Sequence, residues 1–248
     1  MNCMLRNCGR RRLVVPFLAT WAIIAIGVAG ATAADTAVQK DDGFTRLFEG
    51  DKGKTWVGYG KDTWPEGWVL SEGVLHRTAG GGDLQTVEEF GDFDLRFGWK
   101  IAPGGNSGVM YRVSREKGPA YLTGPEYQIL DNAAHQDGKS PLTSAGSLYA
   151  LYPPTKDVVK PAGEWNRSRI VLEGNRVRHF LNGEKVVDVE MGSDDWREKL
   201  AASKFATWPK FAKNKRGHVV LQDHGDEAWY RNMRIKRLDA KAAKPASK

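Results

Sequence analysis

Between residues 92 and 101, apolar side chains occupy every second position, and polar side chains or glycine fill the positions between them. The apolar set is Phe93, Leu95, Phe97, Trp99 and Ile101. A period of two is that of a β-strand with one buried face, and it does not fit a helix. The centre of the chain is therefore predicted to be a long strand that covers a hydrophobic core.

The rest of the chain follows the same pattern. Asn182-Gly183 joins residues 176–181 to residues 184–190 and predicts a hairpin with a type I′ turn. Further strands are expected at residues 68–77 (a hairpin), 83–87, 107–113, 125–130, 147–151, 165–173, 217–224 and 228–238. Helix is expected only over residues 193–205, where Ser193 can cap the first turn. These elements predict an all-β fold, a two-sheet antiparallel jelly-roll sandwich with one short helix.

The N-terminus reads as a targeting segment. A basic start that includes Arg10, Arg11 and Arg12 precedes an apolar stretch, which ends in the small-residue pattern Ala31-Thr32-Ala33. This predicts a secretory signal peptide over residues 1–33, either of the general type or of the twin-arginine type. We expect export to the periplasm or the exterior of a bacterium, without stable membrane insertion once the signal is cleaved.

Removal of the predicted signal peptide changes what the net charge and the cysteine count imply. The formal charge is +7, but residues 1–33 carry four arginines and no acid, and residues 239–248 form a lysine-bearing tail. Both cysteines, Cys3 and Cys8, leave with the signal. We expect a linker over residues 34–42 and one near-neutral, cysteine-free domain over residues 43–238. A nucleic-acid partner is not expected, and neither a disulfide nor a thiolate nucleophile is available. The oligomeric state is left open.

Polar residues gather where predicted strands end. Period two places Glu126 and Gln128 on one face of their strand, and Gln222 and His224 on one face of another. Residues 104–112 form a glycine-rich turn and a strand that should present Arg112 on the same face as Met110. The remaining candidates are Asn106, Asp131, His135, Tyr149, Lys160, Trp165 and Asp223. Convergence of several such segments predicts a single polar site, although each segment alone is compatible with an ordinary solvated strand.

Taken in order, several of these segments resemble the 3-keto-disaccharide hydrolase domain family. They are Gly43-Phe44 with Leu47-Phe48, Asp92-Phe93-Asp94-Leu95, Asn106-Ser107-Gly108, residues 126–131, Gly163-Glu164-Trp165-Asn166, Leu181-Asn182-Gly183 and residues 221–225. The resemblance implies the concanavalin A-like lectin/glucanase sandwich. It also implies cleavage of glycosidic bonds in 3-keto-glycosides or 3-keto-disaccharides, with an oligosaccharide or glycoside as substrate.

The expected chemistry follows from the ketone. A C3 ketone acidifies the hydrogen on C2, so that a base can form an enolate and the group on C1 is expelled. Either Glu126 or His224 would be the base, and Arg112 would stabilise the enolate. Asp131 and His135 would act as acid, orienting group or metal ligand. Substrate contacts are expected from Asn106, Gln128, Tyr149, Lys160, Trp165, Gln222 and Asp223.

Three matters stay open at this point. No cofactor is required, but a divalent metal could replace Arg112 as the electrophile, and its ligands are unknown. A conventional glycoside hydrolase would need two carboxylates. A non-catalytic carbohydrate-binding module would share the fold, but it would not need Glu126, Arg112 and His224 to meet in one pocket.

Overall fold

A computed structural model of the chain describes residues 43–48 and 52–239. The predicted signal peptide (1–33), the linker (34–42) and nearly all of the predicted tail lie outside the described residues. Within the described ranges, no helix combines the length and the apolar composition needed to cross a bilayer.

The larger sheet has eight strands in the order β11-β10-β9-β6-β13-β4-β3, with β1 also paired to β13. Its strands are β1 (Thr45–Arg46), β3 (Trp68–Ser71), β4 (Val74–Arg77), β6 (Phe93–Ile101), β9 (Asn166–Glu173), β10 (Arg176–Leu181), β11 (Glu184–Glu190) and β13 (Ala228–Arg237). Every pairing in it is antiparallel.

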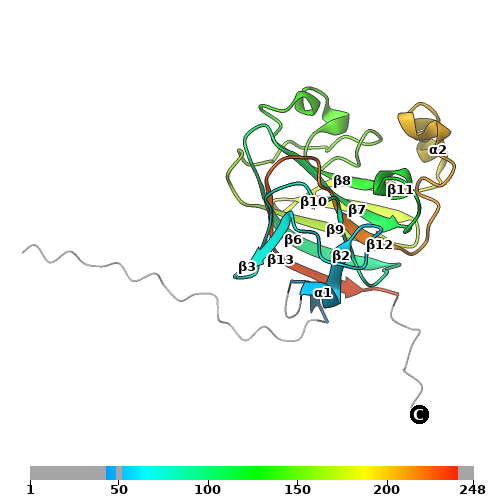
Figure 1. The fold of residues 1–248 in the computed structure, drawn as a ribbon. Coiled ribbons are helices and arrows are strands. Elements are labelled where there is room, and N and C mark those ends of the chain that lie inside the picture. The colour runs from blue at the N-terminus through cyan, green and yellow to red at the C-terminus, as the bar shows by residue number, and fades with distance from the viewer. Residues whose placement is uncertain (1–42, 49–51, 240–248) are drawn as a thin grey trace, which may run out of the picture. The chain divides into compact units, whose positions relative to one another are not determined.

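The smaller sheet has five strands in the order β2-β5-β12-β7-β8, again antiparallel throughout. Its strands are β2 (Trp56–Gly58), β5 (Leu84–Thr86), β7 (Asn106–Val113), β8 (Glu126–Leu130) and β12 (His218–Leu221). The helical elements are α1 (Lys52–Thr55), α2 (Asp194–Ala201), η1 (Ala120–Leu122), η2 (Gln136–Lys139), η3 (Pro141–Thr143) and η4 (Lys204–Thr207). In Figure 1 the strands form stacked layers, with α2 at one side of them.

The core lies between the two sheets and draws alternate residues from each. Phe93, Leu95 and Trp99 of β6 meet Tyr111 of β7 and Tyr127 of β8 in one cluster of buried side chains. Burial of this many large apolar side chains supplies the main driving force for folding, at about 25 cal/mol for each Å² removed from water. The prediction of an all-β, two-sheet antiparallel jelly-roll sandwich is confirmed.

Individual elements follow the sequence pattern closely. The strand at residues 93–101 and the hairpin on Asn182-Gly183 are confirmed, and both turn residues have the positive φ that a type I′ turn needs. The expected helix at 193–205 is shorter: α2 ends at Ala201, and a 3₁₀ turn follows. The strand expected at residues 147–151 is wrong, because this segment folds as a turn closed by a bridge from Leu148 to Tyr152.

The outer face of the five-stranded sheet positions the site. Residues that alternate with the core set, among them Met110 and Val220, point away from the main core and form a small second cluster. Glu126 lies opposite Met110 in the ladder and shares this face. The chain around η1 and the chain after α2 contribute side chains over the same face, and together they enclose a cavity.

Candidate active site

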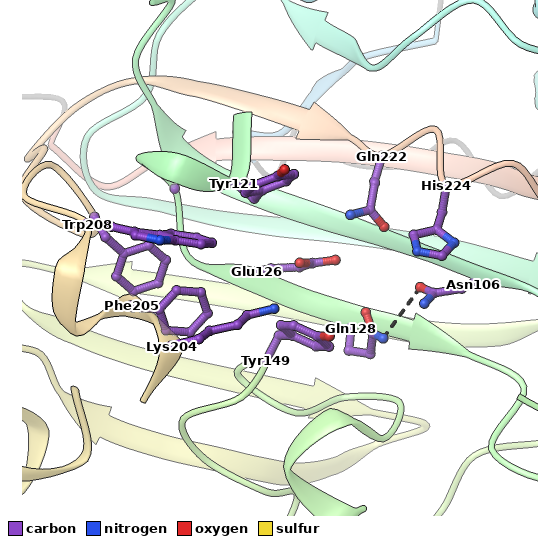
Figure 2. Close-up of a pocket in the computed structure, with 12 residues that line it drawn as sticks. Asn106, Tyr121, Glu126, Gln128, Tyr149, Lys204, Phe205, Trp208, Gln222 and His224 are labelled. Atoms are coloured by element: carbon purple, nitrogen blue, oxygen red, sulfur yellow. Dashed lines mark hydrogen bonds between the residues drawn. The ribbon is translucent and has the colours of Figure 1, made fainter. Parts of the chain in front are cut away.

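A cavity of about 290 Å³ opens on this face, and the side chains that surround it come from distant parts of the sequence (Figure 2). Its lining residues are Asn106, Tyr121, Gly124, Glu126, Gln128, Tyr149, Lys204, Phe205, Trp208, Phe211, Gln222 and His224. Two strands of the five-stranded sheet, β7 and β8, and the segment that follows β12 supply the polar floor, while η1 and the chain from η4 supply aromatic walls.

Glu126 is the buried carboxyl group of the floor. Its carboxylate lies between Lys204 on one side and Gln222 and His224 on the other (Figure 2). Burial raises the pKa of Glu126 to about 8, with a smaller lowering by the Lys204 ammonium and further raising by Asp83 and Asp137. A carboxyl group with a pKa near the working pH can both take up and release a proton, which suits acid–base catalysis.

Gln128 connects Glu126 to the neighbouring strand. Its Nε2 lies 3.4 Å from Oδ1 of Asn106. When the amide is turned by 180°, its nitrogen donates to the Ser107 carbonyl (3.2 Å) and to Oε1 of Glu126 (3.3 Å). The turned orientation gives the amide nitrogen two acceptors in exchange for the longer contact with Asn106, so it is the better assignment. Gln128 therefore fixes the carboxyl group of Glu126 from β8 itself.

Lys204 carries the positive charge of the cavity. Its Nζ lies 4.4 Å from the centre of the Tyr149 ring, which places the ammonium over the aromatic face. Tyr149 is held in turn by a hydrogen bond from its hydroxyl to Oδ2 of Asp137 (3.1 Å). Burial, followed by the Asp137 charge, raises the pKa of Tyr149 above its usual range. Tyr149 thus stays neutral and supports the lysine.

His224 stands at the opposite end of the cavity from Lys204 (Figure 2). Its Nδ1 lies 3.7 Å from Oδ2 of Asp226, a carboxylate that also accepts the backbone N–H of Asn106 (3.0 Å). The ring of His135 meets that of His224 edge to face, with centroids 6.1 Å apart. His135 itself begins η2, where its Nδ1 accepts the N–H of Asp137 (3.0 Å). His135 is therefore a neighbour of His224 and does not line the cavity.

Gln222 contributes an unused hydrogen-bonding group. Its backbone N–H donates to the Gly108 carbonyl (3.0 Å), and its own carbonyl accepts from the Ser107 hydroxyl (2.8 Å). The side-chain Oε1 is buried and has no hydrogen-bond partner among the described residues. Buried polar atoms are normally paired, so this amide is suited to a polar ligand in the cavity.

Arg112 does not belong to the site, and its expected placement beside Met110 is wrong. Between the pairs His218–Val113 and Val220–Met110 the register of β7 gains one residue, and Arg112 has a φ of 52°. Such a bulge redirects the side chain. The guanidinium is buried where it binds Asp92 (2.9 Å) and the carbonyl of Gly174 (2.9 Å). The enolate-stabilising role predicted for Arg112 is therefore withdrawn.

Two predicted acidic residues serve the backbone instead. Asp131 accepts the N–H groups of Gly104 (2.8 Å) and Ala133 (3.1 Å). Asp223 binds Arg77 at 2.6 Å and accepts the N–H groups of Gly81 and Gly82. Neither carboxylate lines the cavity. Asp223 still matters for the site, because it anchors the segment that carries Gln222 and His224.

Two predicted sugar contacts lie elsewhere. The side chain of Lys160 is exposed and absent from the cavity lining. Trp165 lies on the outer face of the eight-stranded sheet, where its ring is covered by Arg231 at 4.0 Å and Lys100 at 5.6 Å. Asn106, Gln128, Tyr149 and Gln222 are thus the predicted substrate-binding positions that the structure brings to the cavity.

The sequence prediction missed the aromatic wall and its lysine. Lys204 and Phe205 begin the 3₁₀ turn η4, and Trp208 and Phe211 follow it. Phe205 and Phe211 stack with centroids 4.0 Å apart, and Phe205 meets Trp208 edge to face at 5.0 Å. Aromatic residues at a spacing of three beyond the end of a short helix were the available signal.

In residues 43–48 and 52–239, His, Cys, Asp and Glu side chains do not gather in groups of three or more that could hold a metal ion. The divalent metal suggested by the sequence therefore stays a prediction.

Comparison with known proteins places this geometry in context. The family model of the 3-keto-alpha-glucoside-1,2-lyase-like domain matches residues 43–236. A 3-keto-disaccharide hydrolase of Bacteroides thetaiotaomicron is 35% identical over 230 residues, which cover 80% of this chain and 79% of the relative. A crystal structure of a candidate glycosyl hydrolase from Parabacteroides distasonis is 33% identical with a TM-score of 0.72, and the match covers 79% of this chain and 94% of that one. A second such structure from the same organism is 28% identical with a TM-score of 0.63, covering 79% and 99%.

Proposed function

The chain belongs to the 3-keto-alpha-glucoside-1,2-lyase-like domain family, and on that premise we propose that it cleaves the glycosidic bond of 3-keto-glycosides, 3-keto-disaccharides among them. The family match confirms the resemblance found in the sequence motifs. The relative of Bacteroides thetaiotaomicron that is named 3-keto-disaccharide hydrolase supports the substrate class. The proposal includes export, because the N-terminal sequence has the pattern of a secretory signal.

One observation carries the proposal. Of the described residues that line the cavity, Glu126 is the only carboxylic acid, and it lies between a lysine and a set of amide and imidazole groups. A conventional retaining or inverting glycosidase needs two carboxyl groups that flank the scissile bond. A single carboxyl with a pKa of about 8, between a cation and hydrogen-bond donors, suits proton abstraction next to a ketone.

The mechanism assigns Glu126 as the base. In its ionised form, Glu126 takes the proton from C2, and the electron pair of that bond forms the enolate, whose charge resides on the C3 oxygen. We assign this role to Glu126 because its carboxylate lies between the Lys204 end and the His224 end of the cavity. In the sugar ring, C2 likewise lies between C1, which carries the leaving group, and C3, which carries the ketone. Base strength favours the same choice, since a raised pKa makes the carboxylate a stronger proton acceptor.

The two ends of the cavity serve the two other reacting atoms. Asn106 and His224 lie at one end and would donate hydrogen bonds to the enolate oxygen, while the Oε1 of Gln222 beside them, unpaired among the described residues, would accept one from a sugar hydroxyl. Lys204 lies at the other end, where its ammonium would give a proton to the glycosidic oxygen as the C1–O bond breaks. Water then adds across the C1–C2 double bond, which yields the free 3-keto sugar, or the unsaturated sugar is released.

The test incubates the purified chain with a 3-keto-disaccharide and, separately, with the parent disaccharide, each with a divalent metal and with a chelator. We expect cleavage of the ketone substrate alone. In D₂O the released 3-keto sugar should carry deuterium at C2, and substrate deuterated at C2 should react more slowly. Glu126→Gln should lose about 100-fold or more in kcat/KM, whereas Glu184→Gln, an exposed control that pairs with Lys156, should keep full activity.

Each alternative has its own outcome. Cleavage of the parent disaccharide at an equal rate, without deuterium at C2, would favour a conventional glycosidase. Cleavage of neither sugar under any condition would favour a carbohydrate-binding module. Full activity in Glu126→Gln together with loss in His224→Ala would reassign the base to His224 and leave the substrate class intact.

A further inference from the structure

A second cavity of about 310 Å³ lies beside the first, and we infer that it holds the group attached to C1, which is an uncharged aromatic aglycone. This inference rests on the proposed function. Tyr59, Pro119, Leu122, Trp208 and Pro209 supply the apolar part of the lining. Cavities of this size are within the range that holds small ligands, about 300–1,000 Å³.

The same two segments build both cavities. Around η1, Tyr121 faces the first cavity and Leu122 faces the second. After η4, Trp208 borders both, and its ring lies 5.5 Å from that of Tyr121. Trp208 thus borders both cavities, and the aglycone would pass the edge of its ring from the first cavity into the second.

The volume of the first cavity and the position assigned to the glycosidic oxygen both favour an aglycone in the second cavity. At about 290 Å³ the first cavity is at the lower limit for a small-molecule site, so a glycoside with a bulky aglycone has to extend beyond it. The glycosidic oxygen is assigned to the Lys204 end of the site. Lys204 is followed by Phe205, which contacts Trp208 with ring centroids 5.0 Å apart. The aglycone therefore leaves the reacting sugar on the side of Trp208.

The lining selects an aromatic aglycone over a second sugar. The hydroxyl of Tyr59 donates to the carbonyl of Ser114 (3.1 Å), and the hydroxyl of Thr123 donates to the carbonyl of Ala120 (3.3 Å). These two hydroxyl protons are already engaged, which leaves Thr207 and Lys117 as further polar residues of the lining. Against its apolar part, sugar hydroxyls would lose their hydrogen bonds to water without replacement. Lys210 pairs with Glu116 at 2.5 Å, so Lys117 is the one charged residue of the described lining outside that pair.

The test compares benzyl and methyl 3-keto-glucosides, because benzyl alcohol and methanol are leaving groups of similar acidity. We expect kcat/KM for the benzyl compound to be about tenfold higher. Leu122→Asp places a charge in the second cavity and should remove that advantage, while methyl-glycoside cleavage stays within about twofold. Val87→Asp, at an exposed position after β5, is the matched control and should change neither rate.

A binding measurement separates this inference from the proposed function. Benzyl alcohol should shift the indole N–H resonance of Trp208 in the wild-type protein and leave it in place in Leu122→Asp. If neither glycoside is cleaved but this shift occurs, the proposed function fails and the aromatic site stands. Equal rates for benzyl and methyl glycosides, or an equal loss on both in Leu122→Asp, would overturn the inference.

Discussion

The carboxyl group of Glu126 lies directly across the backbone of Gly108 on the neighbouring strand. A methyl group at Gly108 would place its Cβ 1.9 Å from Oε1 of Glu126, far inside contact distance. Gly108 pairs with Gln128 in the β7–β8 ladder, and Glu126 pairs with Met110, so the side chain leans along the strand over the glycine. Glycine is therefore required here for side-chain space.

We therefore expect Gly108→Ala to lower the activity of the protein and to leave its stability nearly unchanged. The clash involves the far end of a flexible side chain, which can move aside at small cost, and alanine is favoured over glycine within a strand by about 0.5–1 kcal/mol. We expect the free energy of unfolding to change by less than about 1 kcal/mol while kcat/KM falls about 100-fold. Urea denaturation and steady-state kinetics on a 3-keto-disaccharide measure the two quantities.

The result has a matched control. Gly73→Ala alters a glycine in the β3–β4 turn with a φ of 74° and open space around its Cα. It should lower stability through backbone strain and leave the kcat/KM of the folded protein unchanged. Full activity in Gly108→Ala would contradict the assigned position of Glu126.

Strand alternation was sufficient to place the floor of the site. Period two predicted that Glu126 and Gln128 share an outer face, and both line the cavity. Gln222 and His224 line it too, although β12 ends at Leu221 and both residues lie in the segment that follows. The same period gave the wrong face for Arg112, because a β-bulge adds one residue to β7 and the pattern of polar and apolar residues does not reveal it. Alternation along a strand predicts which face of the sheet a side chain occupies only as long as the pairing register is unbroken.

Arg112→Met tests the structural assignment that follows. The guanidinium is buried and binds Asp92 and the Gly174 carbonyl, so its removal leaves those acceptors unpaired. We expect a loss of about 2–3 kcal/mol in the free energy of unfolding, reduced from the value for a fully buried pair because Asp92 is partly exposed. The kcat/KM of the folded enzyme should stay within about twofold.

Arg115→Met is the control for that measurement. Arg115 pairs with the exposed Asp62 at 2.9 Å, and an exposed pair contributes less than about 1 kcal/mol. If Arg112→Met kept its stability and lost activity, the original prediction that Arg112 stabilises the enolate would be restored.

The walls of the site were predictable only in part, for a different reason. Lys204 and Trp208 follow a short helix in sequence, but they reach the cavity only because the chain after α2 folds over residues of β7 and β8. A contact of this kind depends on tertiary packing, and local periodicity carries no information about it. Trp165 shows the opposite error: it is of a residue type typical of sugar sites, but it lies against the eight-stranded sheet, away from the cavity.

Lys204→Met should alter both the rate and its pH dependence. The ammonium of Lys204 lowers the pKa of Glu126, so its removal should raise that pKa further. Because the base must be ionised, kcat/KM in the wild type should rise with pH up to about 8, and in Lys204→Met the rise should occur at higher pH. The maximum should fall about 100-fold, since the proton donor for the leaving oxygen is lost.

Lys199→Met provides the comparison. Lys199 is an exposed lysine of α2 that pairs with Asp195 and lies outside the cavity lining. Its pH–rate profile should match that of the wild type. A profile in Lys204→Met with the wild-type midpoint would show that Lys204 does not act on Glu126, and a wild-type rate that falls as pH rises through 8 would make Glu126 the general acid.

Glu126 should also make folding stability depend on pH. Burial raises the pKa of Glu126 from 4.5 in the unfolded chain to about 8 in the folded protein. Below pH 4.5 both states are protonated, and Glu126 has no effect. Between pH 4.5 and 8 only the unfolded chain releases the proton, so stability falls with rising pH by up to about 1.4 kcal/mol for each pH unit.

Glu126→Gln removes this ionisation, so the variant should gain stability relative to the wild type as pH rises from about 5 to 8, with no further gain above that range. Urea denaturation at a series of pH values measures the difference. The comparison with the wild type is needed because Asp83, whose pKa burial raises to about 6, adds a similar slope to both proteins. A difference that stays constant across this range would show that the Glu126 carboxyl is ionised in the folded protein, and the resting site would then hold the base already without its proton.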